Sequence, residues 1–325
     1  MRIGMSSSCF YPEETEVSLR RIGESGAKTA EIFFNTPSEL QGDLLRELCA
    51  IRDHYGMEIV SIHPFMSFAE GFWLFSEYER RFRDSLDFYP HFFEAAEALG
   101  AHLFVLHGAK NLKIEPARYA ERLFLLNEKA KPFGVQVAHE NVVHYVGKDP
   151  AFMEMLQKAL GRDFAMVLDL KQAYRTGVDP FAFIETVGDS IVHVHASDSD
   201  MTHDCMPPGK GAFPFPRLFD ALEGHGYNGK YLIELYRHNF RDERDLTEAH
   251  LSHVGVQKAD IGGLTAVGKS HLVVSAGVSF GPGPLILDLT VAVRLGKITG
   301  PAGLLIGGNG HDGIGGPAHI GVPGQ

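Results

Sequence analysis

Short apolar runs alternate with amphipathic stretches along the first 250 residues of the chain. The apolar runs occupy residues 2–6, 29–34, 58–63, 102–107, 135–140, 164–169, 191–196 and 231–236. Each run has the length of a β-strand and is rich in aliphatic residues, which predicts strands that are buried on both faces.

The stretches between these runs have helical periodicity. They lie at residues 13–26, 38–56, 77–100, 117–134, 150–161 and 215–226, and several of them end on glycine, as helix C-termini often do. Strands that alternate with helices predict a parallel sheet with right-handed crossovers. Eight such units in about 250 residues predict a (β/α)₈ TIM barrel. The competing architecture is a doubly wound open sheet, which usually has a Gly-rich turn after its first strand, and the sequence GMSSSCF is not such a turn.

The composition changes near residue 250, and we therefore divide the chain into a barrel domain, 1–250, and a C-terminal extension, 251–325. The extension holds 18 of the 36 glycines, no glutamate and seven charged residues. Glycine and proline at this density oppose both helices and strands, although the runs 271–280 and 284–295 are β-branched and could pair. We predict an atypical, poorly ordered Gly-rich extension of unknown function. It is a weakly folded addition, an interaction tail or the product of a shifted reading frame.

The overall composition is that of a globular protein, with 44% hydrophobic and 22% charged residues. No apolar run reaches the length of a membrane span, and the N-terminus lacks the layout of a secretory signal. The three cysteines, Cys9, Cys49 and Cys205, are scattered and fit a reducing compartment. These features predict a cytoplasmic protein that binds no membrane.

The formal net charge of −11 bears on the choice of partner. Phosphate contacts dominate the affinity of proteins for nucleic acids, so an acidic chain is a poor candidate for nucleic-acid binding. We expect a small molecule as the partner.

Metal-capable side chains stand at the ends of six consecutive predicted strands. In a TIM barrel the active site lies at the carboxyl ends of the strands. Alone, a histidine at such a place is usually structural, and an aspartate usually caps a turn or a helix. Together, three carboxylates and several histidines around one barrel mouth would repel one another without a cation. The six residues are His63, His107, Glu140, Asp169, His195 and Glu234.

Four of these residues form the candidate metal site: Glu140, Asp169, His195 and Glu234. Three carboxylates and one imidazole make an oxygen-rich ligand set. It favours one divalent ion such as Mn²⁺, Mg²⁺ or Co²⁺, with Zn²⁺ as a further possibility. Four protein ligands leave open positions for two substrate oxygens.

Residues 1 to about 250 resemble the xylose isomerase-like TIM-barrel superfamily of sugar phosphate isomerases and epimerases. The motifs that carry the resemblance are VLHGA, VAHEN, VLDLKQA, HVHASD, CMPPGKGAFPF and GYNGKYLIELY, and the last two are fairly specific. The family holds its metal with a Glu, an Asp, a His and a second Glu in that chain order. The resemblance therefore implies the same four residues, Glu140, Asp169, His195 and Glu234.

The resemblance also implies an activity. Ketose 3-epimerases of the family use the two metal-bound glutamates as an acid/base pair. Glu140 and Glu234 would then be catalytic, one removing a proton beside a carbonyl and the other returning one from the opposite face. The expected protein is a divalent-metal-dependent isomerase or epimerase of a sugar or sugar phosphate in carbohydrate metabolism. Barrels of this family commonly pair, but the sequence leaves both a monomer and a homo-oligomer open. Two positions depart from those epimerases: Gln172 replaces a histidine and Met201 replaces an arginine.

Six residues, two of them among those at the strand ends, are candidates for substrate binding. The two histidines at the mouth would orient hydroxyls, and the aromatic stretch 68–82 is predicted to be a lid that carries the only tryptophan. A lysine in the PPGKG turn and an arginine after the last strand would meet a phosphate or a carboxylate, or else are solvated surface charges. These candidates are His63, His107, Gln172, Lys210, Arg237 and Trp73.

Three alternative functions remain open. A dehydratase of polyols or inositol-type ketones would share the metal set. An endonuclease IV-like phosphodiesterase would bind three zinc ions and use His63 and His107, although His203 and Cys205 stand where its Asp-x-His pair is expected. A non-catalytic sugar-binding protein would need neither Glu140 nor Glu234, and a barrel does not by itself imply an enzyme.

Overall fold

The computed structural model describes residues 3–246, and the extension expected at 251–325 lies outside the described residues. Eight parallel strands close into a barrel in chain order, with β8 pairing to β1. The predicted (β/α)₈ fold is therefore confirmed. Within the described residues, no helix has both the length and the apolar composition that a membrane crossing requires.

The strands lie where the apolar runs predicted them, within about three residues at each end. They are β1 (Ile3–Ser6), β2 (Thr29–Phe33), β3 (Glu58–His63), β4 (Leu103–Leu106), β5 (Gln136–Glu140), β6 (Met166–Asp169), β7 (Ile191–Ala196) and β8 (Tyr231–Ile233). Almost every strand residue is buried, because the barrel interior packs on one face and the helices pack on the other.

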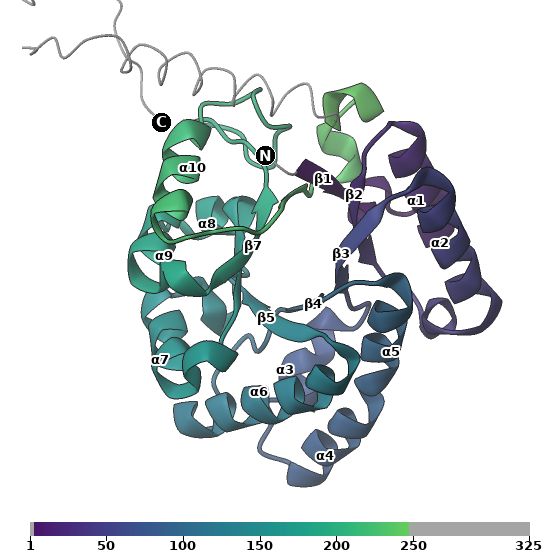
Figure 1. The fold of residues 1–325 in the computed structure, drawn as a ribbon. Helices are drawn as coiled ribbons and strands as arrows, with labels where there is room; N and C mark the ends of the chain where they lie inside the picture. Colours follow the sequence, from purple (N-terminus) through teal and green to yellow (C-terminus); the bar gives the residue numbers. More distant parts are fainter. Residues whose placement is uncertain (1–2, 247–325) are drawn as a thin grey trace, which may run out of the picture. The chain divides into compact units, whose positions relative to one another are not determined.

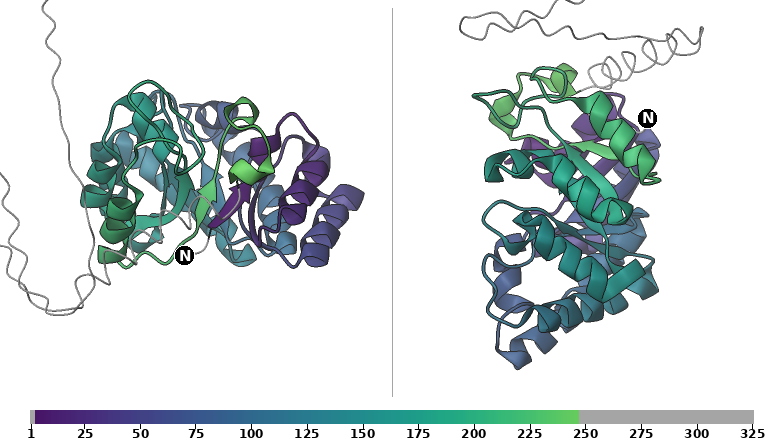
Figure 2. Two further views of the ribbon diagram at one scale, coloured as in Figure 1. Left: turned by 90° about the horizontal axis from the view of Figure 1, so that it is seen from above. Right: turned by 90° about the vertical axis from the view of Figure 1, so that its left-hand side faces the viewer.

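The helices form a ring around the strands (Figure 1). They are α1 (Thr15–Glu24), α2 (Gly42–Tyr55), α3 (Glu70–Trp73), α4 (Glu79–Phe88), α5 (Pro90–Leu99), α6 (Pro116–Ala130), α7 (Pro150–Leu160), α8 (Leu170–Thr176), α9 (Pro180–Val187) and α10 (Phe215–Gly224). Figure 2 shows α1 and α2 on one side of the barrel and α9 and α10 on the opposite side.

Short 3₁₀ turns complete the connections between these elements. They are η1 (Ser7–Phe10), η2 (Pro37–Leu40), η3 (Ser67–Ala69), η4 (Lys131–Phe133), η5 (Val146–Lys148), η6 (Gly161–Asp163), η7 (Gly188–Ser190), η8 (Arg237–Asn239) and η9 (Glu243–Leu246).

Two helical regions differ from the pattern of the sequence. The single helix predicted over 77–100 is divided into α4 and α5, because Pro90 has no backbone N–H and begins a new helix at its first position. After β6 the chain forms α8 at once, with the Asp169 side chain accepting a hydrogen bond from the Gln172 backbone N–H at 2.8 Å. This cap brings Lys171 and Gln172 to the mouth of the barrel.

Gly108, in the VLHGA motif, allows β4 to turn sharply at the same end of the barrel. Its φ is +82°, a conformation that side chains disfavour, and a Cβ there would lie 2.1 Å from the Tyr119 hydroxyl. The Gly108 N–H donates to the Glu70 carboxylate at 2.6 Å, which ties α3 to the exit of β4.

Candidate metal centre

Strand register brings the predicted ligands together. Asp169 of β6 lies directly beside His195 of β7, and Ala196 pairs with Ile233, the residue before Glu234. Glu140 ends β5, whose neighbour is β6. One ligand-capable atom from each of these four residues lies within 4.8 Å of the others, and all four side chains are buried.

The imidazole of His195 stands at the centre of the cluster. Its Nδ1 is 3.2 Å from Glu140 Oε1, 3.6 Å from Asp169 Oδ2 and 3.6 Å from Glu234 Oε2. Its Nε2 is 3.1 Å from Glu31 Oε2. The two ring nitrogens therefore face different carboxylates, with Nδ1 directed at the candidate metal position.

Glu31, on β2, is a functional candidate that we did not predict from the sequence. It is fully buried and accepts a hydrogen bond from the Ser61 hydroxyl at 2.7 Å, while His193 Nε2 lies 3.6 Å away. A carboxylate that accepts the second N–H of a metal-binding histidine fixes its tautomer and its orientation. Glu31 faces His195 Nε2 and would hold His195 in this way if His195 binds a metal.

Lys171 is a second residue that the sequence analysis missed. Its ammonium is buried, 2.6 Å from Glu234 Oε2 and 3.4 Å from Asp169 Oδ2, and it lies 5.1 Å from the Tyr236 ring. Burial alone would lower the pKa of Lys171, but Asp169 and Glu234 raise it well above its usual value. Lys171 therefore places a positive charge beside two of the four candidate ligands.

The carboxylates of the cluster differ in their pKa. Burial raises the pKa of Asp169 to about 6, although Lys171 opposes the shift. Burial also acts on Glu140, but the imidazoles of His107, His195 and His63 beside it hold its pKa well below the usual range. The Glu234 carboxyl is likewise lowered, against the effect of burial, by Lys171 and His195.

His195 is a positively charged partner of these carboxylates. Burial opposes its protonation, but Glu31 and Glu234, with hydrogen bonds to Asp169 and Glu140, raise its pKa well above 6.5. Four carboxylates thus share one imidazolium and one ammonium in the interior. A divalent cation would compensate this excess of negative charge.

The donor atoms fit a divalent ion. Asp169 Oδ2 and Glu140 Oε2 are buried and have no hydrogen-bond partner among the described residues. Glu140 Oε2 lies 2.9 Å from His107 Nε2, within ion-pair distance but without hydrogen-bond geometry. Buried polar atoms that lack partners are uncommon, and two of them in one cluster of oxygens and an imidazole make a donor set that suits a divalent cation.

Two further candidates for substrate binding lie beside this cluster. His107 Nε2 is 3.0 Å from His63 Nε2, and His63 Nε2 is 3.8 Å from Glu140 Oε2. Together with Glu140 these histidines form a second group of ligand-capable atoms within 4.8 Å. Burial lowers the pKa of His107, which favours a neutral ring that can either bind a metal or donate to a hydroxyl.

The remaining candidates have other immediate contacts. Gln172 is buried, and its side-chain oxygen accepts the Val143 N–H at 3.1 Å. Trp73 packs edge-on against Phe88 of α4, with ring centroids 5.5 Å apart. The Arg237 guanidinium donates to the Phe240 carbonyl, and Lys210 is exposed in a turn closed by its own backbone N–H.

The HASD motif after His195 shapes the loop that follows β7. Asp198 is buried and accepts backbone N–H groups from Ser199, Gly209 and Phe213 at 2.8 to 2.9 Å. Asp198 therefore folds the PPGKG turn back toward the end of β7 and is not one of the clustered ligands.

We predict that Glu31→Gln lowers the affinity for Mn²⁺ by about 10- to 100-fold, the usual effect of losing the carboxylate behind a metal-binding histidine. Isothermal titration with MnCl₂ measures the effect. Glu70→Gln is a matched control, since Glu70 is an equally buried carboxylate that bonds to a backbone N–H instead of His195. Equal Mn²⁺ affinities for Glu31→Gln and the wild type would show that Glu31 does not act on the metal site.

A closed eight-stranded parallel barrel with a buried Glu–Asp–His–Glu cluster at the carboxyl ends of its strands defines a TIM-barrel protein with a candidate metal centre. The chain belongs to the xylose isomerase-like TIM barrel family, whose model matches residues 19–254.

Among its relatives is the fructoselysine 3-epimerase of Escherichia coli O157:H7, 26% identical over 251 residues that cover 72% of this chain and 90% of the relative. A solved D-tagatose 3-epimerase-like protein superimposes with a TM-score of 0.65 at 22% identity, covering 82% of this chain and 100% of its own. The D-psicose 3-epimerase from Clostridium cellulolyticum H10, solved with D-tagatose, gives a TM-score of 0.61 at 18% identity, with coverage of 81% and 99%. The two structures show a likeness of fold.

Proposed function

We propose that the protein is a divalent-metal-dependent sugar or sugar phosphate isomerase or epimerase, which acts by proton abstraction next to a carbonyl. The observation that carries the proposal is the convergence of Glu140, Asp169, His195 and Glu234 within 4.8 Å at the barrel mouth. The epimerase relatives within the same family support it.

Glu140, Asp169, His195 Nδ1 and Glu234 would hold the ion. When bound, the ion polarises a carbonyl and stabilises the negative charge that develops on its oxygen. Among the residues of the chain, Glu140 and Glu234 are the candidate acid/base pair, because each has an oxygen at the cluster and each is kept ionised by its neighbours. One would take the proton from the carbon beside the carbonyl, and the other would return a proton to the opposite face.

The neighbours of the two glutamates would bind substrate hydroxyls and orient the candidate ligands. His107 and His63 lie 2.9 and 3.8 Å from Glu140 Oε2 and could donate hydrogen bonds to substrate hydroxyls. Lys171 touches Glu234 and would orient that carboxylate. Glu31 would accept a hydrogen bond from His195 Nε2–H and so keep Nδ1 of the same ring available to the ion.

The experiment that tests the proposal is exchange with solvent deuterium. The protein with Mn²⁺ is incubated in D₂O with a panel of ketoses, ketose phosphates and inositol-type ketones, and products are read by NMR and mass spectrometry. Deuterium at a carbon next to the carbonyl, together with an inverted centre or a moved carbonyl, is the expected result. Loss of water from the substrate would indicate a dehydratase instead, and binding without exchange or reaction would indicate a sugar-binding protein.

A phosphodiesterase is the second candidate, and one observation favours it. His63, His107 and Glu140 form a second ligand group that shares Glu140 with the first, an arrangement that could hold two ions. His203 and Cys205, which stand where the endonuclease pair is expected, belong to neither of these two groups, and His203 is exposed and bonds to Asp200. Two or more tightly bound zinc ions, with hydrolysis of a phosphodiester, would favour this function over the isomerase.

A further inference from the structure

A pocket of about 490 Å³ lies at the end of the barrel where the strands have their carboxyl termini. Its walls come from the loops that follow β3, β4 and β5, so they belong to the face where barrel enzymes bind substrate. The volume is within the range of pockets that hold small ligands.

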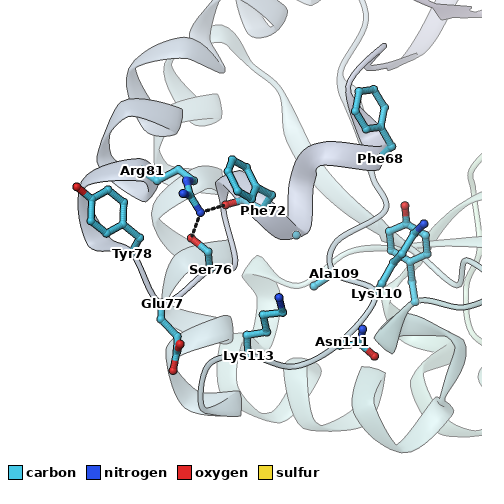
Figure 3. A pocket seen from close by; sticks show the side chains of 12 residues that line it. Phe68, Phe72, Ser76, Glu77, Tyr78, Arg81, Ala109, Lys110, Asn111 and Lys113 are labelled. Carbon is cyan, nitrogen blue, oxygen red and sulfur yellow. Dashed lines mark hydrogen bonds between the residues drawn. The ribbon is translucent and has the colours of Figure 1, made fainter.

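Positive charge predominates among the residues that line this pocket. Arg81, Lys110 and Lys113 line it together with one carboxylate, Glu77. Within residues 3–246, none of these three cations forms an ion pair with a carboxylate. In Figure 3 the Lys113 side chain extends from the β4 loop toward the α3–α4 segment, whereas the Glu77 carboxylate points away from it. This is unexpected in a chain whose net charge is −11.

Arg81 is held in place by neutral groups. Its guanidinium lies 3.5 Å from the centre of the Phe72 ring and donates to the Phe72 carbonyl and the Ser76 hydroxyl (Figure 3). Stacking on an aromatic face and bonding to neutral oxygens orient an arginine while leaving its charge uncompensated. Such an arginine is suited to a phosphate or carboxylate.

A short chain of contacts joins the pocket to the metal centre. The Lys110 ammonium is 5.7 Å from the Tyr145 ring, and that ring meets the His107 ring edge-on, with centroids also 5.7 Å apart. His107 Nε2 in turn lies 2.9 Å from Glu140 Oε2. A ligand with one end at Glu140 could therefore extend past Tyr145 toward Lys110.

Exposed aromatic rings stand over the same opening. Phe68 of η3 and Phe72 of α3 are 78% and 58% exposed, which is a high degree of exposure for phenylalanine. Carbohydrate C–H faces and aliphatic chains pack well on such rings. The pocket therefore combines apolar surface with unpaired positive charge.

Resting on the proposed function, we infer that this pocket is a subsite for an anionic group at the far end of the sugar substrate. Arg81, Lys110 and Lys113 would bind the phosphate or carboxylate, with Tyr145 between that group and the reacting carbons. The substrate class is therefore a sugar phosphate or a sugar acid in preference to a neutral sugar. This site is distinct from Lys210 and Arg237, which the sequence suggested for the same purpose.

The test measures binding of inert probes, so that it does not depend on turnover. A hexitol 6-phosphate, a hexonate and the neutral hexitol are titrated into the full chain loaded with Mn²⁺. We expect the phosphate or the hexonate to bind at least about 10-fold more tightly than the hexitol, and the tighter of the two identifies the group. A double variant, Lys110→Met with Lys113→Met, should lose most of this preference, and so should Arg81→Met alone.

The control variant is Lys210→Met, which removes an exposed lysine at the β7–β8 loop, outside the residues that line the pocket. Its preference for the anionic probes should equal that of the wild type. Equal affinities for all three probes would overturn the inference, as would a preference lost in Lys210→Met and kept in the double variant. If the protein prefers the anionic probes but shows no deuterium exchange with any ketose, the anionic subsite is supported and the proposed isomerase or epimerase function is rejected.

Discussion

Glu234→Gln is expected to lower kcat by about 10³-fold or more while leaving the barrel folded. General acid–base groups contribute about 10²- to 10⁴-fold, and Glu234 is also a candidate ligand, so its loss removes a proton carrier and a metal contact together. Deuterium exchange into the substrate should fall in parallel with turnover. Glu140→Gln should behave in the same way.

The stability of this variant distinguishes a catalytic role from a structural one. Glu31, Glu140, Asp169 and Glu234 share only the charges of His195 and Lys171. Removing the Glu234 charge lowers the repulsion among the carboxylates but also removes one ion-pair partner of Lys171. Lys171 keeps Asp169 as a partner and can donate to the glutamine oxygen, so the free energy of unfolding without metal should fall by about 1–3 kcal/mol, which leaves the barrel folded.

Glu185→Gln, an exposed carboxylate on α9, is the control for turnover and stability and should match the wild type in both. Gross unfolding of Glu234→Gln would instead assign that residue a structural role. Turnover within a few-fold of the wild type in both glutamate variants would remove the acid/base pair from the mechanism.

Lys171→Met is expected to destabilise the metal-free protein by about 3–5 kcal/mol, the usual effect of removing one partner from a buried ion pair. For a domain of this size, each kcal/mol corresponds to about 2–4 °C in Tm. The loss arises because Asp169 and Glu234 keep their burial but lose the adjacent ammonium.

Mn²⁺ should restore most of this loss, since a divalent cation supplies positive charge to the same carboxylates and stabilises the folded state by binding to it. The difference in Tm between wild type and Lys171→Met should thus be large in EDTA and small in saturating MnCl₂. The difference in Tm between the wild type and Lys171→Met should also be smaller at pH 5.5 than at pH 8. The pKa of Asp169 is already about 6, and without Lys171 this carboxyl takes up a proton more readily.

Lys230→Met provides a matched comparison. Lys230 is also buried, but its partner Glu58 is half exposed and lies away from the cluster. Its effect on Tm should be smaller and should not depend on Mn²⁺. An equal loss for Lys171→Met with and without Mn²⁺ would mean that Lys171 contributes through packing instead of charge.

The sequence predicted the barrel because local pattern determines most of it. Eight aliphatic runs separated by amphipathic stretches leave few alternatives, and strand order and handedness follow from general rules. The convergence of the four candidate ligands also followed, since carboxyl ends of parallel strands meet on one face. Asp169 and His195 are neighbours for this reason, although 26 residues separate them in the chain.

Residues whose role depends on tertiary contacts were harder to find. Glu31 lies within a strand instead of at its end, and only the closure of the barrel brings it to His195. A carboxylate in the middle of an apolar run was the signal that could have identified it. Lys171 resembled an ordinary residue in the first turn of a helix, and its pairing with Glu234 depends on the path of the chain after β8.

Binding of one divalent cation by Glu140, Asp169, His195 and Glu234 can be tested by diffraction from crystals grown with MnCl₂, with data collected at the manganese absorption edge. We predict an anomalous peak about 2.0–2.3 Å from an oxygen of each carboxylate and from His195 Nδ1. A peak elsewhere, or no peak at these four side chains in saturating MnCl₂, would rule out this metal site and the mechanism built on it.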